Sequence, residues 1–384
     1  MGSKKKILFV NDEMMMGGVA RVLNTLMANL DRDKYEIDCL ILHKRGELLN
    51  EIPSDVNVLE TSKFFNVVDY PIKQLIKEKR IFKIIKKLLL IFYMKSGLIE
   101  FKIKKERKKI IKKEYDIEVA AKEGFCTIFS AYGNSRKKIN WVLTDYSVCN
   151  YSKNHMKLMK KVLKNIDLNL SDSKEAVEAY EKVFGVSNTL AIHNLMDTER
   201  VEARMSMKCD ISLNKKETNV VVVARFHPQK NVKRVLLAHK KAIEMGIKHN
   251  LFIVGGGQEE RMLKDFVKLN NLSRVKFLGY MSNPYALISK CDLFALSSEY
   301  EGFATIVNES LICHTPVLAT KVSGISEQIT KDFHGWICDN DDESFIEKYI
   351  DIICKKDILT NMKDKLVDYK YPNDKILEQF QNVL

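Results

Sequence analysis

Short apolar runs alternate with amphipathic helical patterns along almost the whole chain, and this alternation restricts the fold more than any other feature. Strands that are separated by helices pair in parallel, and the helices cover both faces of the sheet. The sequence therefore predicts an α/β protein. The expected strands span residues 7–10, 37–42, 56–59, 117–121, 139–142 and 168–171 in the first half, and 220–224, 251–254, 275–278, 293–296 and 317–319 in the second half.

A chain of 384 residues is longer than one hydrophobic core usually holds, so we expect two domains. The first series of strands ends near residue 190, which places an N-terminal domain at 1–190 and a C-terminal domain at 191–365. Residues 366–384 are expected to form a helix that returns to the N-terminal domain. Each domain should be doubly wound, or Rossmann-like, and the carboxyl ends of the two sheets should face a central cleft where ligands bind.

The sequence argues against several other classes of protein. No stretch of 18 or more residues is free of charge, so no membrane-spanning helix is expected. The first residues lead directly into an apolar strand and lack the apolar segment and cleavage site of a signal peptide, which favours a cytoplasmic protein. The eight cysteines are scattered and form no C-x-x-C pair, which disfavours a disulfide framework and a zinc site.

The strongest functional motif is the segment 301–309, which follows the apolar strand at 293–296 and opens a helix. It carries Glu301 and Glu309, two carboxylates that eight residues of helix would separate by about 12 Å. Carboxylates accept hydrogen bonds from paired hydroxyl groups, so one acid can bind a sugar and the other a ribose. Gly302 lets the backbone approach a ligand, and the free N–H groups at the helix start suit a diphosphate. Two solvated glutamates beside a helix start are the alternative.

Polar and glycine residues follow the neighbouring strands as well. Arg225 and Lys230 lie just beyond the strand at 220–224, where cations would neutralise a diphosphate and stabilise a departing nucleotide. Each such residue alone is common on a surface, but here several spaced motifs agree in their order and structural context. The other motifs beside strands are Gly255-Gly256-Gly257, Gly279-Tyr280 and Thr315-Pro316.

Taken in this order, residues 220–329 resemble glycosyltransferase family four, the retaining GT-B enzymes that use nucleotide sugars, and the resemblance extends more faintly over the first half. It implies a GT-B fold and a retaining transfer of a sugar from a nucleoside-diphosphate sugar, with a UDP-sugar favoured, to a hydroxyl group. The transferred group would be a hexose or an N-acetylhexosamine. The acceptor would be lipid-linked or a cell-surface polysaccharide precursor.

The resemblance also implies roles for individual residues. Glu301 would contact the donor sugar, and Glu309 would bind the ribose. Arg225 and Lys230 would bind the diphosphate and complete the catalytic group with Glu301. The other donor-binding residues would be Gly17, Gly18, Gly302, Phe303, Ala304 and Thr305, the first two through a loop of the N-terminal domain that closes over the diphosphate.

The sequence departs from the family pattern at Leu143. The strand before it usually leads to a histidine beside the donor sugar, and here leucine stands at that position, followed by Thr144 and Asp145. We therefore take Asp145 as the catalytic candidate of the first domain, with a helix cap as the alternative role. His314 and Ser323 replace two glycines of the pattern, which we expect to change only helix packing.

Two D-x-D triplets occur, at 31–33 and 339–341, and this motif binds a divalent metal in the other glycosyltransferase fold. Both triplets lie at a turn or a helix start, where short carboxylates cap free N–H groups. The histidines have no spacing typical of a metal cluster. We therefore expect no metal and no other cofactor.

The net charge of +13 originates in one segment. Residues 73–113 contain 16 Lys or Arg and 3 acidic residues, an excess of 13. Between 72 and 92 the apolar residues fit one face of a helix, and lysines lie off that face. We expect this insertion, at 72–113, to bind an anionic membrane surface and to hold the enzyme on the inner face of the cell membrane. A helix whose apolar side packs into the first domain is the alternative. Nucleic-acid binding is not expected, because no motif for it is present.

Two other functions remain open at this point. A sugar-nucleotide epimerase of the same fold would release an altered sugar and need no acceptor. A non-catalytic nucleotide-sugar-binding partner of another transferase would bind the donor and transfer nothing. The absence of the usual histidine at Leu143 is the feature that keeps this last alternative open.

Overall fold

The computed structural model describes residues 4–68, 70–148, 151–331 and 333–384. Two compact units make up the chain: unit 1 comprises Met1–Leu195 with Asn373–Leu384, and unit 2 comprises Met196–Pro372. The chain therefore passes from one unit to the other after residue 195 and again after residue 372, where the sequence had placed the boundaries at 190 and 365.

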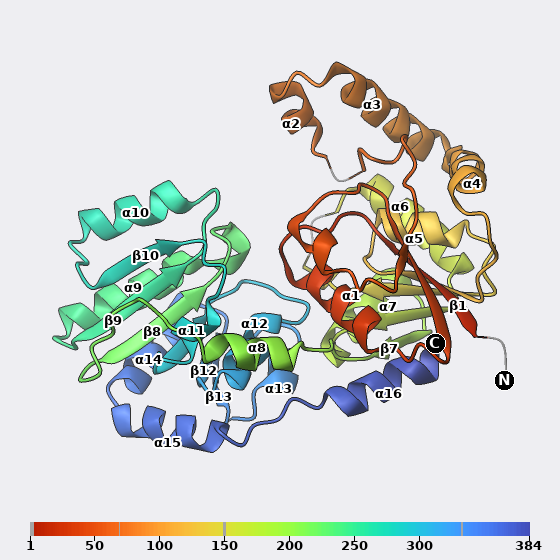
Figure 1. The fold of residues 1–384 in the computed structure, drawn as a ribbon. Helices are drawn as coiled ribbons and strands as arrows, with labels where there is room; N and C mark the ends of the chain where they lie inside the picture. The colour runs from red at the N-terminus through yellow and green to blue at the C-terminus, as the bar shows by residue number, and fades with distance from the viewer. Residues whose placement is uncertain (1–3, 69, 149–150, 332) are drawn as a thin grey trace. The chain divides into compact units, whose positions relative to one another are not determined.

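Unit 1 is built on a seven-stranded parallel sheet in the order β3-β2-β1-β4-β5-β6-β7 (Figure 1). The apolar runs predicted six of these strands. The seventh, β7, was not expected, because it has only three residues and its central Leu190 is exposed. The strands are β1 (Lys5–Asn11), β2 (Tyr35–Ile41), β3 (Asn57–Val58), β4 (Ile117–Ala120), β5 (Lys137–Val142), β6 (Leu168–Ser171) and β7 (Thr189–Ala191).

The helices of unit 1 include the last helix of the described chain. Helix α16 packs on the sheet of unit 1, where the rings of Phe380 and Trp141 lie 5.2 Å apart. The Lys5 and Lys137 side chains donate hydrogen bonds to the final two carbonyl groups, over 3.0 and 2.6 Å. The helices are α1 (Gly18–Asn29), α2 (Ile72–Lys77), α3 (Ile81–Ser96), α4 (Ile99–Ile110), α5 (Phe125–Ala131), α6 (Lys153–Val162), α7 (Lys174–Phe184) and α16 (Asn373–Val383), with short 3-10 helices at Glu47–Glu51 and Leu163–Asn165.

Unit 2 has a six-stranded parallel sheet in the order β10-β9-β8-β11-β12-β13. Five strands follow the predicted apolar runs, and β13, which begins with a glycine, was missed. The strands are β8 (Thr218–Val223), β9 (His249–Val254), β10 (Val275–Gly279), β11 (Leu293–Leu296), β12 (Val317–Thr320) and β13 (Gly335–Cys338). The helices are α8 (Thr198–Met205), α9 (Val232–Glu244), α10 (Glu260–Leu269), α11 (Tyr285–Ile288), α12 (Thr305–Ile312), α13 (Ile325–Gln328), α14 (Asp342–Ile353) and α15 (Lys356–Leu366), with a 3-10 turn at Pro228–Lys230.

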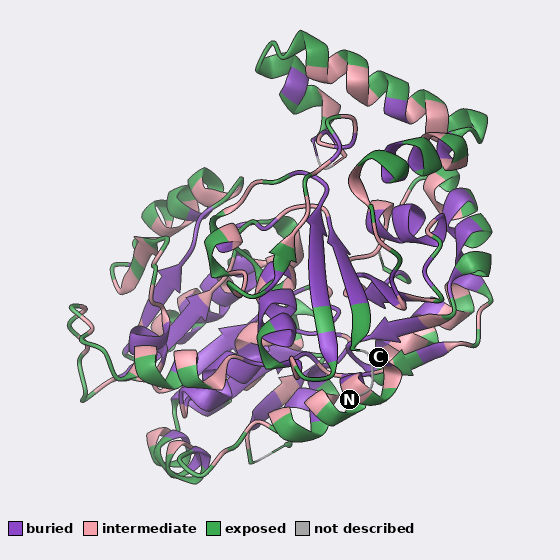
Figure 2. Cartoon of the chain, turned by 45° about the vertical axis from the view of Figure 1, so that its right-hand side comes forward, coloured by how far each residue is buried: buried purple, intermediate pink, exposed green. Residues whose placement is uncertain are grey.

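The central strands of both sheets are largely buried, whereas the edge strands β3, β7 and β10 are partly exposed (Figure 2). In unit 2 both faces of the sheet are buried in apolar clusters. Val221 of β8 belongs to one cluster, whereas Val220 and Val222 belong to the other. Successive side chains of a strand point to opposite faces, so helices that cover both faces leave no polar face on β8. This explains the continuous apolar run from which the strand was predicted. Within the ranges described above, no helix is both long and apolar enough to cross a lipid bilayer.

The basic insertion differs from the single helix expected between residues 72 and 92. The helix breaks between α2 and α3, where Lys79 adopts the left-handed conformation with φ 53°. Together with α4, these helices project from the sheet of unit 1 (Figure 1). Helix α3 contacts the core of unit 1 through Leu90, Tyr93 and Met94. The predicted single helix is therefore wrong, although the apolar periodicity of α3 is present.

The apolar stripe of α3 faces outward rather than into the domain. The exposed fraction of its side chains ranges from 45% at Leu89 to 84% at Phe82. The lysines of the opposite side bind the body of unit 1: Lys83 donates to the Tyr70 hydroxyl over 3.2 Å, and Lys87 donates to the Val68 carbonyl over 2.8 Å. The alternative in which the apolar side packs into the first domain is therefore excluded. The stripe consists of Ile81, Phe82, Ile85, Leu88, Leu89 and Phe92.

One cation of the insertion is buried in unit 1. Arg107 of α4 forms a bidentate ion pair with Glu118 of β4, over 2.8 and 2.7 Å, and the two side chains are 6% and 0% exposed. Ser135 donates a further hydrogen bond to the same carboxylate. The pair joins the end of the insertion to the middle of the sheet.

We expect Arg107→Met to lower the free energy of unfolding of unit 1 by about 3–5 kcal/mol, because it leaves the Glu118 carboxylate buried without a cation. Arg136→Ala is the matched control: Arg136 pairs with Asp116 on the surface and is 84% exposed, so its loss should cost less than about 1 kcal/mol.

Denaturant unfolding can be followed in unit 1 alone. Of the two tryptophans, Trp141 lies in unit 1 and Trp336 in unit 2, so a Trp336→Phe background leaves a fluorescence signal from unit 1. Equal, small effects of both arginine substitutions would contradict a structural role for the buried pair.

Candidate functional site

The order of the strands reverses at one place in each sheet. In unit 2 the chain builds outward from β8 to β10 and then returns to place β11 on the other side of β8. The loops after β8 and β11 therefore lead away from each other and leave the carboxyl ends of these two strands uncovered, which is where open α/β sheets bind ligands. The same reversal lies between β1 and β4 in unit 1.

Glu301 and Lys230 meet at the reversal of unit 2. The Lys230 ammonium lies 2.5 Å from Glu301 Oε1, and the Ser298 hydroxyl donates to the same oxygen. Glu301 is 7% exposed, and the Lys230 ammonium balances the charge of its carboxylate. The two residues come from the loops after β11 and β8, and the site prediction had named both.

Further hydrogen bonds hold these two loops together. The Glu299 amide donates to the Gln229 carbonyl over 2.8 Å, and the Gln229 side chain donates to the Tyr300 carbonyl over 2.9 Å. Ser297 Oγ donates to the Asn231 carbonyl over 2.9 Å. Lys230 and Glu301 are therefore held on a fixed frame.

Arg225 lies on the same loop as Lys230 but is exposed. Its guanidinium makes no hydrogen bond or ion pair with any residue that the structure describes, which leaves its donors open to a ligand. The backbone around it is fixed by the glycines after β9. Gly255 has φ +129°, and a Cβ there would lie 1.9 Å from the Ala224 carbonyl oxygen; a Cβ at Gly257 would lie 2.6 Å from the Phe226 carbonyl oxygen.

The segment from Gly302 to Ala304 is buried, and α12 begins only at Thr305. The separation of about 12 Å inferred for Glu301 and Glu309 assumed a helix throughout. That assumption is wrong, because the first part of the motif is a loop. The Gln328 side chain donates to the Ala304 carbonyl over 2.9 Å and fixes the end of this loop.

Glu309 lies inside α12 and is 8% exposed. The buried Tyr285 of α11 donates its hydroxyl to Glu309 Oε1 over 3.2 Å. A carboxylate can accept hydrogen bonds from the paired hydroxyl groups of a ribose. The ribose-binding role of Glu309 stays a prediction.

Sequence reasoning missed Arg234, whose buried side chain holds the loop after β11 to the start of α14. Arg234 is 4% exposed, and its guanidinium binds Glu299 over 2.9 Å and Asp342 over 2.7 Å. It also donates to Asn340 in the second D-x-D triplet over 2.7 Å. Its place in the sequence, one turn into a helix, gives no sign that loops from β11 and β13 converge on it.

The two D-x-D triplets act as turn and capping residues. Asp341 accepts a hydrogen bond from the Ser344 amide over 2.8 Å and caps α14, and this holds the pKa of Asp341 below its usual range. Asp31 accepts from the Asp33 amide over 2.8 Å within a turn. Among the described residues, no three His, Cys, Asp or Glu side chains gather in a way that could hold a metal ion.

In unit 1, Gly17 and Gly18 lie at the start of α1, after β1, and both are exposed. Gly17 has φ 163°, an extended conformation that any residue adopts, and an added Cβ would meet nothing within 4 Å. The packing of unit 1 therefore does not require a glycine at this position. Close approach of a ligand remains a prediction for it.

Asp145 is buried and belongs to a turn rather than to the cap of the next helix. Its Oδ1 accepts hydrogen bonds from the amide and the hydroxyl of Ser147, over 2.8 and 2.6 Å. Ser152 is the residue that caps α6. The helix-cap alternative for Asp145 is thus wrong, and its catalytic role stays a prediction.

A carboxylate that sequence reasoning missed lies beside Leu143. Glu123 follows β4, and its Oε2 accepts a hydrogen bond from the Leu143 amide over 3.0 Å while its Oε1 accepts from the Thr144 hydroxyl over 2.7 Å. The preceding Lys122 binds Asp12, after β1, over 2.6 Å. Burial works to lower the pKa of Lys122, but the attraction of Asp12 outweighs it and raises that pKa.

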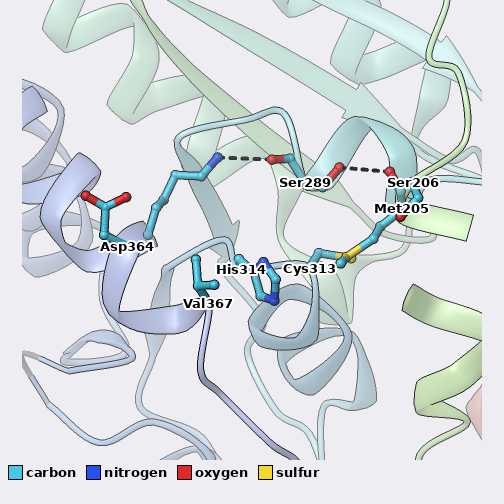
Figure 3. A pocket seen from close by; sticks show the side chains of 8 residues that line it. Met205, Ser206, Ser289, Cys313, His314, Asp364 and Val367 are labelled. Atoms are coloured by element: carbon cyan, nitrogen blue, oxygen red, sulfur yellow. Dashed lines mark hydrogen bonds between the residues drawn. The ribbon is translucent and has the colours of Figure 1, made fainter. Parts of the chain in front are cut away.

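A cavity of about 340 Å³ lies at the opposite edge of the unit 2 sheet (Figure 3). It is lined by Cys313 and His314, which precede β12, and by Lys363 of α15, whose ammonium binds the carbonyls of Ser289 and Cys291. His314 has φ +57°, a conformation that favours the glycine of the family pattern. From the sequence we expected His314 to change only helix packing. The structure shows that this histidine also lines a cavity.

Comparison with known proteins finds a family model that matches most of unit 2. Residues 206–371 match the family Glycosyl transferases group 1. The N-acetyl-alpha-D-glucosaminyl L-malate synthase of Bacillus anthracis is 27% identical over 214 residues, which are 54% of this chain and 56% of that protein. An N-acetylgalactosaminyltransferase of Campylobacter jejuni, which acts on N-acetylgalactosamine-N,N'-diacetylbacillosaminyl-diphospho-undecaprenol, is 29% identical over 222 residues, or 56% and 59% of the two chains. The chain thus spans little more than half the length of these relatives.

Solved structures match over nearly the whole chain. HepE of Anabaena, solved with UDP, has a TM-score of 0.70 at 17% identity and covers 98% of this chain and 99% of its own. TarM of S. aureus has a TM-score of 0.70 at 13% identity, with 99% of each chain covered. At these identities the likeness establishes the fold.

The glycines of the two units lead to a paired prediction. Gly255→Ala should lower the melting temperature of unit 2 by several degrees, because the added Cβ meets the Ala224 carbonyl and φ +129° disfavours alanine. Gly17→Ala should leave the melting temperature within about 1 °C of the parent, because its Cβ meets nothing. Differential scanning calorimetry measures both. A large loss at Gly17 would show that the packing of unit 1 requires that glycine.

Proposed function

We propose that this chain moves a sugar from a nucleoside-diphosphate sugar to a hydroxyl group of an acceptor, because residues 206–371 match the family Glycosyl transferases group 1. The predicted GT-B fold, with two Rossmann-like domains on parallel sheets, is confirmed by the strand orders and by the solved structures that match the whole chain. The observation that carries the proposal is the meeting of Lys230 and Glu301 at the strand reversal of the matched region.

The donor in this proposal is a UDP-sugar with a hexosyl or N-acetylhexosaminyl group. UDP is bound in the solved structures of HepE and TarM, and the relatives from Bacillus anthracis and Campylobacter jejuni are named for N-acetylhexosamine transfer. The acceptor is a lipid-linked or cell-surface polysaccharide precursor. Support comes from the diphospho-undecaprenol acceptor in one relative's name and from a poly(ribitol-phosphate) N-acetylglucosaminyltransferase of Staphylococcus aureus.

The charges at the site suit the departure of a diphosphate. In the proposed reaction the bond between the anomeric carbon and the diphosphate breaks, and its electron pair leaves with the nucleoside diphosphate. The acceptor oxygen bonds to the same face of the sugar, which retains the configuration, and its proton passes to the departing phosphate. Lys230 and Arg225 stabilise the charge that develops on the diphosphate. No metal is needed for this step in the proposal.

In the proposed binding mode, Lys230 and Glu301, which form an ion pair, contact different parts of the donor. When Lys230 turns to a diphosphate, the Glu301 carboxylate loses its cation and becomes free to accept hydrogen bonds from sugar hydroxyls. The backbone of Gly302, Phe303, Ala304 and Thr305 then lines the sugar and diphosphate positions.

We further propose that the insertion at 72–113 binds an anionic membrane surface, which would keep the enzyme near a lipid-linked acceptor. The exposed apolar stripe of α3 would enter the acyl boundary of the bilayer. Exposed lysines of the insertion, such as Lys77, Lys95 and Lys105, would each contribute about 1 kcal/mol at an anionic surface. Lys83 and Lys87 are not part of this surface, because they bind the Tyr70 hydroxyl and the carbonyls of residues 67 and 68.

We expect Lys230→Ala and Glu309→Ala to weaken UDP binding by about tenfold or more, because each removes a charged partner of the nucleotide. Glu301→Ala should leave UDP affinity unchanged and lower the turnover number. Isothermal titration with UDP in the presence of EDTA measures the affinities and tests independence from metal at the same time. Glu299→Ala, on the same loop as Glu301, is the control for a general loss of loop structure. Unchanged affinity in both of the first two variants would contradict the donor-site assignment.

We expect the triple substitution Phe82→Ser, Leu89→Ser and Phe92→Ser to reduce sedimentation with phosphatidylglycerol vesicles at least fivefold without lowering the melting temperature, because the three side chains are exposed. The parent chain should bind neutral phosphatidylcholine vesicles less and lose binding as salt is added. Lys95→Glu tests the charge beside the stripe.

Two results would contradict the membrane proposal. The first is that the triple variant sediments as fully as the parent chain, and the second is that the parent chain binds neither kind of vesicle. Either result would leave the stripe without a role at a lipid surface.

A further inference from the structure

Each sheet places the tripeptide Glu-Gly-Phe after the strand that lies beyond its reversal. In unit 2 this is Glu301-Gly302-Phe303, after β11, and in unit 1 it is Glu123-Gly124-Phe125, after β4. Helix α5 begins at Phe125, so Glu123 and Gly124 form the turn from strand to helix. The two carboxylates therefore have the same topological position in their units, at the edge where open sheets bind ligands.

The Glu123 carboxylate is held in a fixed orientation. One oxygen accepts the Leu143 amide over 3.0 Å, and the other accepts the Thr144 hydroxyl over 2.7 Å. Both partners lie directly after β5, so Glu123 bridges the carboxyl ends of two neighbouring strands. A carboxylate has about four acceptor positions, and these bonds use two of them. The others remain for a ligand.

The charge of Glu123 differs from that of Glu301 in one respect. Within the part of the chain that the structure describes, no Lys, Arg or His lies within ion-pair distance of Glu123, since the adjacent Lys122 binds Asp12. His155 stacks on Tyr151 at 4.5 Å, and burial lowers the pKa of this histidine despite the opposing effect of the Glu123 charge. The carboxylate is thus a half-buried anion whose remaining partners must be hydrogen-bond donors.

We infer that Glu123 is a sugar-binding residue of unit 1, which accepts hydrogen bonds from hydroxyl groups of the sugar in the nucleotide-sugar donor. This inference rests on the proposed function. Neutral hydroxyl groups donate to a carboxylate without neutralising it, and hydrogen bonds to a charged acceptor are stronger than those between neutral groups. Glu123 accepts a hydrogen bond from the backbone amide of Leu143. It therefore supplies a polar group next to the apolar Leu143 side chain.

The test compares ligands with and without the sugar. Glu123→Gln should weaken the binding of UDP-glucose, UDP-N-acetylglucosamine or UDP-N-acetylgalactosamine, whichever the parent chain binds, by about tenfold, and should leave UDP affinity within about twofold. Thr144→Val is the matched control, because it removes one anchor of Glu123 but keeps the carboxylate. It should lower the melting temperature as Glu123→Gln does, yet change the two affinities equally.

The outcomes separate this inference from the proposed function. Equal effects of Glu123→Gln on UDP and on each UDP-sugar would make Glu123 an anchor between two loops only and overturn the inference. A loss specific to the sugar in Asp145→Asn, with none in Glu123→Gln, would assign the role to Asp145 instead. If the parent chain binds neither UDP nor any of the three nucleotide sugars, the donor assignment fails and the inference fails with it.

Discussion

The reversal of strand order in each sheet sets the position of the candidate donor-site residues in this chain. A helix that joins two parallel strands crosses the sheet in a right-handed sense, so a sheet that starts in the middle must reverse its direction of growth to continue on the other side. The reversals at β1/β4 and β8/β11 leave strand ends that no helix covers. Charged residues can stay at these ends because water or a ligand reaches them, whereas the same residues inside the sheet would be buried without partners.

The two strand reversals carry ion pairs of opposite polarity. In unit 2 a lysine from the first loop holds a glutamate of the second, and the arginine beside it stays open. In unit 1, Lys122 of the second loop pairs with Asp12 of the first loop, and the neighbouring Glu123 accepts hydrogen bonds from Leu143 and Thr144 but forms no ion pair with a described residue. The group without an ion-pair partner among the described residues is therefore a cation, Arg225, at the reversal of unit 2 and an anion, Glu123, at the reversal of unit 1.

The sequence predicts the strands and the unit 2 site because both depend on local pattern. Buried parallel strands read as continuous apolar runs, and Arg225, Lys230, Glu301 and Glu309 lie at fixed distances from such runs. The orientation of α3 could not be predicted in this way, because periodicity defines an apolar stripe but does not say which side meets the domain. Carbonyl groups of the loop at 63–68 bind the lysines and decide it. Glu123 was missed for a similar reason: its partners, some twenty residues later, are neighbours only through the sheet.

Helix α16 has a consequence for the synthesis of the protein. The ribosome produces every residue of unit 2 before it produces the helix that covers Trp141 of unit 1. Until then, the β5 side of that sheet exposes a large aromatic ring and leaves the Lys5 and Lys137 side chains without the carbonyl partners they later bind. Unit 1 therefore completes its folding after translation of unit 2, although its first residue emerges long before. A nascent chain arrested within unit 2 exposes this surface to chaperones and proteases.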